Sequence, residues 1–243
     1  MFRLILSDEK NKMINRRRIE QLIRESSQRA KRQRKEFSVF DRITVSVMDE
    51  LPASVDMLVV VDKLEKTIPH HLFDEIDEIF VGSFSENDER ALEAHYESGA
   101  IYMTSDLPTN DDYVENIVHE TAHSMESARG LEIYGDGKIE IEFAGKRRRL
   151  SSEFKSHGIM ASHLNFEDLD YDPEFDSFLY KEIGYENMYS FTTGLFASPY
   201  GATSLREYFA NGFEEFFLGN REHLKRISPQ LFTKLMEIIN NDF

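Results

Sequence analysis

The chain of 243 residues contains no cysteine and no tryptophan. The absence of cysteine excludes disulfides, iron–sulfur clusters, thiolate zinc sites and cysteine nucleophiles. Any metal ion must therefore be bound by His, Asp, Glu or Tyr side chains. No apolar run approaches the roughly 18 residues of a membrane span, and the apolar residues 2–6 are too few for a signal peptide. We therefore expect a cytoplasmic protein, although a secreted toxin-like or virion-associated protein would share these features.

Apolar residues are nevertheless plentiful. Hydrophobic side chains make up 40% of the chain and aromatic ones 12%, with 19 Phe and 10 Tyr. This is enough apolar material for a core, so a wholly disordered chain is excluded. The length fits one large domain, or one domain with an appendage.

The net charge of −16 is unevenly distributed along the chain. Residues 1–36 hold twelve basic and five acidic side chains, a balance of +7, so the rest carries −16 − 7 = −23. We predict a basic helical arm at 1–38, a linker near 36–41 and one domain at 39–243. Because an acidic domain repels phosphates, nucleic acid is not expected as a partner. The basic segment 10–36 could bind an acidic partner, and a nucleic-acid-bound regulator would have to use it.

Short apolar patterns predict strands in the first half of the domain. The strand-like segments are residues 43–48, 55–61, 78–82 and 99–104. Residues 86–98 have a helical pattern with Ser85 as the N-cap. We expect strand 99–104 to lie at the edge of the sheet and to pair with a substrate backbone.

Helical patterns dominate the second half. Residues 108–112 combine a capping residue with acids and begin a helix that runs to about Ala128 and ends at Gly130. Residues 134–150 are typical of a hairpin, because glycines at 135 and 137 precede alternating apolar residues. The remaining predicted helices cover residues 205–218 and 229–241. The whole pattern predicts an α+β fold with a small mixed sheet.

Residues 119–123 read His-Glu-Thr-Ala-His, an H-E-x-x-H motif inside the predicted helix. The spacing puts His119 and His123 on one helix face, one turn apart, where both can bind the same ion. Glu120 lies beside them and can take a proton from a metal-bound water and return it to a leaving amine. The opposite helix face is apolar and comprises Val114, Ile117, Val118, Ala122 and Met125.

A catalytic zinc ion needs a third protein ligand. An extended motif of the astacin type would need Gly and His where this chain has Glu126 and Arg129. Glu207 is the better candidate, because it is an acid in a strongly apolar helix, where a buried carboxylate needs a cation. Glu214 and Glu215 are rivals, but their positions favour the solvated side of that helix.

The H-E-x-x-H motif combines with a second block at 198–210, Ser-Pro-Tyr-Gly-Ala-Thr-Ser-Leu-Arg-Glu-Tyr-Phe-Ala. Together they resemble the zinc peptidases of the anthrax lethal factor type, a gluzincin group that includes the clostridial Pro-Pro endopeptidases. The seven-residue interval from Tyr200 to Glu207 is the one that this family uses. The motif match covers about residues 113–128 and 198–218.

The resemblance implies a zincin-like metallopeptidase fold and one Zn²⁺ ion per chain. It implies His119, His123 and Glu207 as zinc ligands, and Glu120 as the general base. Tyr200 is implied as the phenol that stabilises the oxyanion. The expected function is therefore a zinc-dependent endopeptidase acting on protein or peptide substrates. The alternative is a catalytically weak or inactive peptidase-fold protein that serves as a structural, assembly or binding component, for example of a phage or mobile element.

One position departs from the family pattern. The family usually has an acid one turn after the glutamate ligand, where it can support a metal-bound histidine, and this chain has Asn211. We therefore expect weaker zinc binding. The acidic run at 168–176 lacks the glycine and final glutamate of a calcium loop and is expected to be solvated. Ordinary surface, loop or core roles are expected for His70, His71, His95, His157, His163 and His223.

Overall fold

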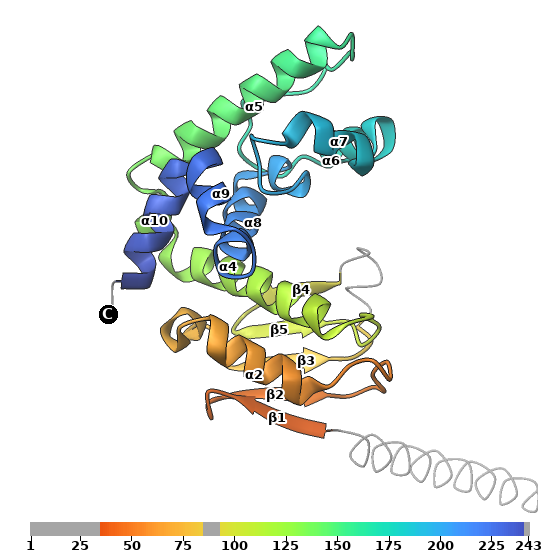
Figure 1. The fold of residues 1–243 in the computed structure, drawn as a ribbon, viewed down its shortest axis with the longest axis vertical. Helices are drawn as coiled ribbons and strands as arrows, with labels where there is room; N and C mark the ends of the chain where they lie inside the picture. Colours follow the sequence, from red (N-terminus) through yellow and green to blue (C-terminus); the bar gives the residue numbers. More distant parts are fainter. Residues whose placement is uncertain (1–34, 85–92, 241–243) are drawn as a thin grey trace, which may run out of the picture.

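The computed structural model describes residues 35–84 and 93–240. The predicted basic segment 10–36 lies outside these residues except for its last two, which begin the first strand. Five strands form one mixed sheet in the order β1-β2-β3-β5-β4 (Figure 1). The strands are β1 (Lys35–Val39), β2 (Ile43–Val47), β3 (Glu78–Val81), β4 (Ala94–Glu97) and β5 (Ala100–Met103). The three central strands run parallel, and each edge strand is antiparallel to its neighbour.

Two helices, α2 (Met57–Thr67) and α4 (Asn110–Tyr134), pack against the sheet on one face (Figure 1). The strands alternate, so that the side chains facing these helices are buried and apolar. They include Ile43, Val45, Ile79, Val81, Ile101 and Met103. The opposite face carries a stack of Phe80, Tyr102 and His95, one from each of three neighbouring strands.

The remaining helices form a second layer, so that α4 lies between this layer and the sheet (Figure 1). They are α5 (Lys138–Ser156), α6 (Pro173–Ser177), α7 (Tyr185–Thr192), α8 (Leu205–Phe217), α9 (Arg221–Ile227) and α10 (Pro229–Asn240). Short turns of other helical types are η1 (His70–Phe73), η2 (Phe178–Ile183) and η3 (Tyr200–Ala202). The α+β class with a small mixed sheet is confirmed. Among the described residues, no helix combines the length and apolar character needed to cross a membrane.

The two helices that carry the candidate site, α4 and α8, begin at residues that cap them through hydrogen bonds. Thr109 and Asp112 form a reciprocal capping box at the start of α4, as the predicted helix start at 108–112 requires. Ser204 caps α8 by accepting a hydrogen bond from the Glu207 backbone N–H at 3.2 Å. The helices predicted at 205–218 and 229–241 are confirmed as α8 and α10.

The strand predicted at 55–61 is wrong, because this segment begins helix α2. Asp56 caps the helix by accepting a hydrogen bond from the Leu58 N–H at 3.0 Å. The buried residues recur with helical spacing, at Met57, Val60, Val61 and Leu64. Tertiary packing on the sheet therefore overrides the strand preference of the valine run.

The helix predicted at 86–98 is wrong where it can be compared, because residues 94–97 form strand β4. Its N-cap, Ser85, lies outside the described residues. The strands β4 and β5 are joined by Ser98 and Gly99, which both have positive φ. This is the backbone of the tight turns that connect hairpin strands, and glycine adopts it without steric cost.

The hairpin predicted at 134–150 is also wrong, because residues 138–156 form the long helix α5. The glycines at 135 and 137 mark a turn between two helices rather than between two strands. Ile141, which the alternating pattern would bury, is 70% exposed, and the buried positions have helical spacing. The buried residues are Ile139, Phe143, Lys146, Arg147, Leu150 and Phe154.

Two boundaries differ from the sequence-based expectation. Helix α4 continues past Gly130 to Tyr134, and Arg129 interrupts it with the non-helical angles φ −121° and ψ 21°. The linker predicted near 36–41 is strand β1 with the turn that follows it. The start of the domain predicted at 39 therefore falls at the last residue of a strand.

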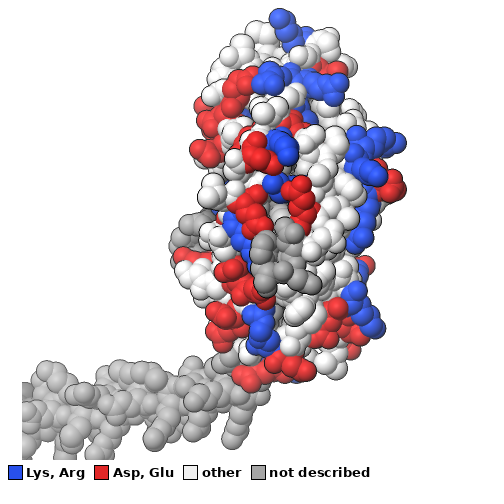
Figure 2. Space-filling view, turned by 90° about the vertical axis from the view of Figure 1, so that its left-hand side faces the viewer, with Lys and Arg blue, Asp and Glu red and all other residues white. Residues whose placement is uncertain are grey.

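Charges of both signs cover the face of the molecule drawn in Figure 2. Acidic side chains lie between the basic ones there, and no continuous basic surface is seen on this face (Figure 2). Mixed charges of this kind keep a surface solvated without creating a strong local potential.

Gly212 allows α8 and α10 to pack closely. A Cβ at this position would lie 2.2 Å from Cδ2 of Leu231, which is fully buried. We therefore expect Gly212→Ala to destabilise the protein by about 1–3 kcal/mol through overpacking. The matched control is Gly145→Ala in α5, where the nearest atom, Nη2 of Arg148, is 3.9 Å away; this change should stabilise by about 0.5–1 kcal/mol. Urea denaturation measures both, and equal effects of the two changes would contradict this packing.

Candidate metal centre

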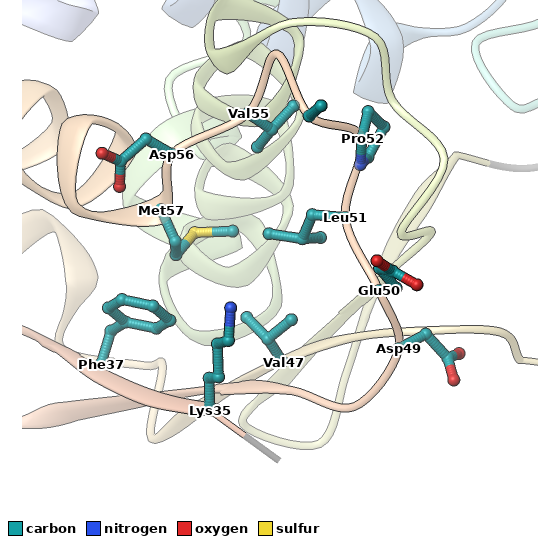
Figure 3. Close-up of a pocket in the computed structure, with 11 residues that line it drawn as sticks. Lys35, Phe37, Val47, Asp49, Glu50, Leu51, Pro52, Val55, Asp56 and Met57 are labelled. Carbon is teal, nitrogen blue, oxygen red and sulfur yellow. The ribbon is translucent and has the colours of Figure 1, made fainter. Parts of the chain in front are cut away.

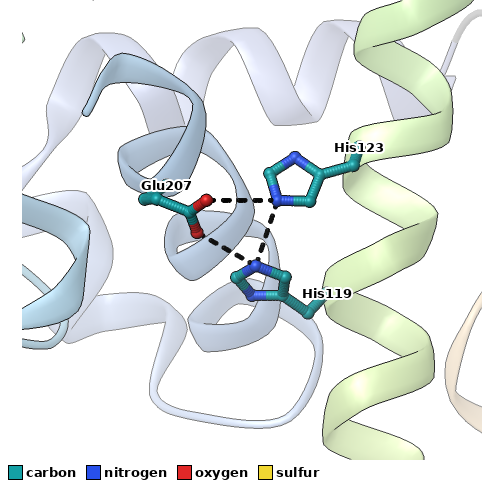
Figure 4. Close-up of side chains that lie close together, drawn as sticks. All are labelled: His119, His123 and Glu207. Carbon is teal, nitrogen blue, oxygen red and sulfur yellow. Dashed lines mark hydrogen bonds and ion pairs between the residues drawn. The ribbon is translucent and has the colours of Figure 1, made fainter. Parts of the chain in front are cut away.

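Three side chains from two helices converge between α4 and α8. His119 and His123 come from α4 and Glu207 from α8, and they point toward one another (Figure 4). Nε2 of His119 lies 3.1 Å from Nε2 of His123 and 3.1 Å from Oε2 of Glu207. Nε2 of His123 lies 3.5 Å from Oε1 of Glu207. Among the described residues, this is the one group of His and acidic side chains whose ligand atoms converge in this way.

The spacing of these atoms fits a tetrahedral zinc ion. Ligand atoms about 2.0–2.1 Å from a tetrahedral zinc ion lie about 3.3 Å from one another. The two Nε2 atoms are 3.1 Å apart and Oε2 of Glu207 is 3.1 Å from Nε2 of His119, both close to this value, while the other carboxylate oxygen, Oε1, lies 3.5 Å from Nε2 of His123. Oε2 of Glu207 is also buried and accepts no hydrogen bond from the described residues. A buried carboxylate oxygen without a donor needs another partner, and a bound cation would be one. The residues present therefore fit the metal that the motif implies.

The tautomers of both histidines follow from their second ring nitrogens. Nδ1 of His123 donates to Oε2 of Glu126 at 2.7 Å, and Nδ1 of His119 donates to Oε1 of Glu214. A carboxylate can only accept, so each Nδ1 carries the proton. In the neutral form that binds a metal, each ring would then direct the Nε2 lone pair toward the other ring and toward Glu207. Carboxylate–histidine pairs of this kind orient a metal ligand and raise its basicity.

The pKa values of these three groups are shifted in the directions that favour protonated histidines and an ionised Glu207. Burial alone would lower the pKa of His119, but the carboxylates of Glu207 and Glu214 raise it to about 10. Burial would raise the pKa of Glu207, but the two histidines lower it to about 2. The pKa of His123 is also raised, by Glu126 and Glu207 against the effect of burial. The metal-free site thus holds a proton where a divalent cation would bind, so metal and proton compete.

Glu126 has further partners of its own. Tyr134, past the interruption in α4, donates its hydroxyl to Oε1 of Glu126. Burial and the neighbouring Glu126 carboxylate raise the pKa of Tyr134 far above its ordinary range, so the phenol stays a donor. Nε of Arg206 lies 3.5 Å from Oε2 of Glu126. These contacts fix the carboxylate that orients His123.

The expectation that Glu214 lies on the solvated side of its helix is wrong. Glu214 stands seven residues, or two helical turns, after Glu207 and faces the same way, so that it reaches His119. Its neighbour Glu215 does face away, and its Oε1 lies 3.2 Å from Nδ1 of His223. The spacing to Glu207 was the sequence signal that could have identified Glu214.

Asn211, from which weaker zinc binding was expected, does not contact either histidine. Its side-chain amide donates to the backbone oxygen of Glu207 at 2.9 Å, and its Oδ1 accepts from the hydroxyl of Ser198. Both ends of the amide are thus used within the α8 region and not on a histidine. Glu126 and Glu214 are the carboxylates that contact the two histidines, and weaker zinc binding stays a prediction.

Glu120 lies at the edge of the same cluster. It is 7% exposed, and its Oε2 accepts a hydrogen bond from the backbone N–H of Tyr96 at 2.8 Å. Among the described residues, no group donates a hydrogen bond to its Oε1. One oxygen is therefore fixed by strand β4, and the other is available to accept a proton.

Tyr200 lies beside His119 in the same cleft. It begins the turn η3, directly before α8, and its ring centre is 6.5 Å from that of His119. It is half-buried and lines the same hollow as His119 and Glu120. The structure thus brings together all five residues predicted for the site.

A cleft opens on both sides of this cluster. One side, of about 480 Å³, contains four carboxylates besides that of Glu120, and no Lys or Arg of the described residues lines it. We call these residues, Glu93, Glu115, Asp176 and Glu214, the acidic wall. Burial, followed by the charges of Glu214, Asp112 and Asp111, raises the pKa of Glu115. The other side, of about 300 Å³, is lined by strand β4 and by Arg206.

The edge strand beside this cleft is β4, so the expectation that 99–104 forms the edge is wrong. Strand β5 confirms the predicted strand, but β3 and β4 pair with its two sides. In the antiparallel register of β4 and β5, the backbone groups of Ala94 and Tyr96 face the free edge. His95 lies on this strand and stacks on Tyr102, so it is not the helix-surface residue that the sequence suggested.

The other histidines lie away from the cluster. His157 is exposed and bonds to the carbonyl of Glu153 at 2.9 Å, and His163 is exposed and packs its ring on Phe178. His70 and His71 form part of the turn η1. The acidic run at 168–176 lies mostly in loops, but its last member, Asp176, belongs to the acidic wall.

A larger hollow, of about 810 Å³, lies at the other edge of the sheet. It is enclosed by β1, the end of β2 and the segment that leads into α2 (Figure 3). Leu51 and Met57 point toward its middle, whereas Asp49 and Asp56 point away (Figure 3). It contains no histidine among its lining residues, so its size does not make it a reactive site.

Comparisons with protein-family models, with curated proteins and with solved structures gave no match to this chain. The resemblance to peptidases of the lethal factor type accordingly remains one of motifs. The chemistry of the centre rests on its own residues and their geometry.

The carboxylates behind the histidines should control metal affinity. We expect Glu214→Gln and Glu126→Gln each to weaken zinc binding by about 10- to 100-fold, because an amide orients the imidazole less strongly and adds no charge. Glu215→Gln is the matched control on the same helix, and it should bind zinc like the wild type. Titration of zinc-stripped protein against a competing chelator measures the three affinities. Equal affinities for Glu214→Gln and Glu215→Gln would show that Glu214 does not support the site.

Proposed function

We propose that this protein is a zinc-dependent endopeptidase of the zincin-like, lethal factor-like type, which hydrolyses peptide bonds in a protein or peptide substrate. His119, His123 and Glu207 would hold one zinc ion. The observation that carries the proposal is the convergence of these ligand atoms, all within 4.8 Å of one another, beside a carboxylate with one oxygen left to accept a proton. When bound, zinc would act as a Lewis acid that polarises the scissile carbonyl and acidifies water.

Glu120 acts as the general base and then as the general acid. It accepts the proton of the attacking water as the new carbon–oxygen bond forms. It returns that proton to the amide nitrogen as the carbon–nitrogen bond breaks, so that the amine leaves neutral. The hydrogen bond from Tyr96 N–H holds the carboxylate in place during both transfers.

Tyr200 would stabilise the negative charge that develops on the carbonyl oxygen of the substrate. Its place at the rim of the cleft next to His119 supports a role in which the phenol donates a hydrogen bond to the oxyanion. The phenol is not a metal ligand in this proposal, so its role is separable from metal binding.

Strand β4 offers a docking edge for the substrate backbone. The free backbone groups of Ala94 lie next to Tyr96, whose N–H contacts Glu120. A substrate that adds a strand here brings its own peptide bonds beside the general base. Antiparallel pairing, the more stable arrangement, would run the substrate from the Arg206 side toward the acidic wall.

We expect Glu120→Gln to abolish detectable peptide cleavage, because general base catalysis contributes about 10²- to 10⁴-fold. Tyr200→Phe should lower kcat by about 10²-fold, because it removes one donor to the oxyanion. Both proteins should still contain about one zinc per chain, since neither residue is a ligand, whereas His123→Ala should lose it. Elemental analysis of untagged protein measures the metal, and a peptide library read by mass spectrometry measures cleavage.

The outcomes separate the two sequence-based hypotheses. Zinc without cleavage in the wild type would favour an inactive peptidase-fold binding component. Absence of zinc, even after incubation with it, would remove the enzyme proposal altogether.

The acidic wall should select basic side chains. We expect peptides with Lys or Arg just C-terminal to the scissile bond to be cleaved faster than matched peptides with Gln or Glu there. Since exposed ion pairs contribute about 0.2–1 kcal/mol each, the paired change Glu93→Gln and Glu115→Gln should reduce this preference about 2- to 5-fold. Glu97→Gln, on the other side of the cleft, is the control. A preference unchanged by the paired substitution, or insensitive to salt, would contradict this role.

A further inference from the structure

Arg147 is a buried cation in helix α5. Its side chain is 1% exposed and is the largest fully buried side chain of the described residues. The guanidinium lies 3.7 Å over the ring of Phe175. Burial lowers its pKa to about 10, so it remains charged at neutral pH. Burying a charge costs several kcal/mol unless hydrogen bonds compensate, so its partners matter.

Those partners are main-chain carbonyls rather than carboxylates. Nη1 donates to the oxygens of Ala202 and Thr203 at 3.4 and 3.2 Å, and Nη2 donates to that of Asn165 at 3.0 Å. Among the described residues, no carboxylate forms a salt bridge with Arg147. The planar fork of an arginine presents its donors in a fixed geometry, whereas a lysine presents three rotatable donors from a single nitrogen.

The carbonyls of Ala202 and Thr203 lie in the segment that connects Tyr200 to Glu207. Thr203 closes the turn η3 by donating its N–H and its hydroxyl to the carbonyl of Tyr200, at 3.0 and 2.8 Å. The next residue, Ser204, caps α8 through the Glu207 N–H. We call residues 200–207 the corner. Arg147 therefore holds the main chain between the phenol and the third metal ligand without touching either.

A second contact joins the corner to the loop that precedes α6. Asn165 lies in that loop, and the carbonyl of Leu169, four residues later, accepts a hydrogen bond from the Leu205 N–H at 2.8 Å. The guanidinium and this hydrogen bond together clamp the loop onto the first turn of α8. The same loop leads to Asp176, a member of the acidic wall.

We propose that Arg147 is a positioning residue of the hydrolytic site, which fixes the corner so that Tyr200 and Glu207 keep their places relative to the two histidines. This inference rests on the proposed peptidase function for its kinetic consequences. The placement of the corner itself can be measured without any activity.

Lys146 provides a matched control on the preceding residue. It is also buried, and its Nζ donates to the hydroxyl of Ser228 and the carbonyl of Ile227, each at 2.7 Å, and to the carbonyl of Leu195. These contacts join α5 to the loop after α7 and to the junction of α9 and α10. Nζ also lies 5.0 Å from the ring centre of Tyr208, but none of these contacts is made to the corner. Loss of either cation leaves buried carbonyls without donors, so both substitutions should destabilise the fold, but only one should affect the site.

The first measurement is amide hydrogen exchange on the full chain, under conditions where urea titration shows each variant to be folded. In Arg147→Met, exchange at residues 200–207 should become about 10-fold faster or more, because the local opening of the corner is less costly. In Lys146→Met, exchange there should match the wild type. Unchanged exchange at the corner in Arg147→Met, or equal acceleration in both variants, would overturn the proposal. Should Arg147→Met not fold, Arg147→Lys keeps the charge but loses the fork, and the same comparison applies.

The second measurement is kinetic and uses the substrate found for the wild type. Arg147→Met should lower kcat by about 10- to 100-fold with little change in KM, because misplaced catalytic groups lose transition-state stabilisation. In the Tyr200→Phe background, Arg147→Met should cost much less, whereas Lys146→Met should remain independent of Tyr200→Phe. Full additivity of Arg147→Met and Tyr200→Phe would overturn the positioning role. If the wild type cleaves no peptide, the peptidase proposal fails by itself, and the exchange comparison still decides the role of Arg147.

Discussion

The structure depends on how two imidazole rings and one carboxylate are held together at the junction of α4 and α8. Nε2 of His119 and Nε2 of His123 lie 3.1 Å apart, with Glu207 against both. Nδ1 of each ring donates a hydrogen bond to a carboxylate. In the neutral rings, the two Nε2 atoms and the Glu207 carboxylate are therefore acceptors that face one another. Such an arrangement is unfavourable unless a positive charge occupies it. The surrounding elements can be understood as what keeps these acceptors from moving apart.

Helix α4 holds the two histidines in place because it packs against both layers of the fold. Its apolar side, with Val114, Ile117 and Val118, is buried against the sheet layer, and its polar side faces α8. Its interruption at Arg129 has a consequence for the site. In a straight helix Tyr134 would lie about 12 Å along the axis from Glu126, yet its hydroxyl contacts that carboxylate. The irregular geometry brings Tyr134 back toward the residue that orients His123.

The parts of the site that follow from local spacing were predictable, and those that depend on long-range packing were not. His119, Glu120 and His123 lie within five residues, so helical periodicity alone places them together. Glu207 lies 84 positions after His123, so no local spacing links them. Its place as an acid in a strongly apolar helix made it a candidate, and the motif resemblance supported it. Glu214 was assigned to the solvated side of α8 because polar residues follow it in the sequence. Its spacing of two helical turns from Glu207 places it on the same helix face as Glu207.

The fold shows the same division. Capped and strongly periodic helices such as α8 and α10 were predicted correctly. Residues 55–61 and 134–150 were not, since a valine run and alternating isoleucines also fit strands until the contacts with other elements are known. The edge position of β4 is set by the order of strands, which no local pattern encodes.

Glu214 connects two properties of the site that would otherwise be independent. Its Oε1 accepts a hydrogen bond from Nδ1 of His119, and the same side chain belongs to the acidic wall of the cleft. A cation bound at the wall would compete with His119 for this carboxylate and so weaken its hydrogen bond to the imidazole. A metal ion held by His119 would polarise the N–H toward Glu214 and reduce the negative charge of the acidic wall. Because coupling free energies are reciprocal, the charge of the side chain in the cleft and the affinity of the metal centre must each depend on the other.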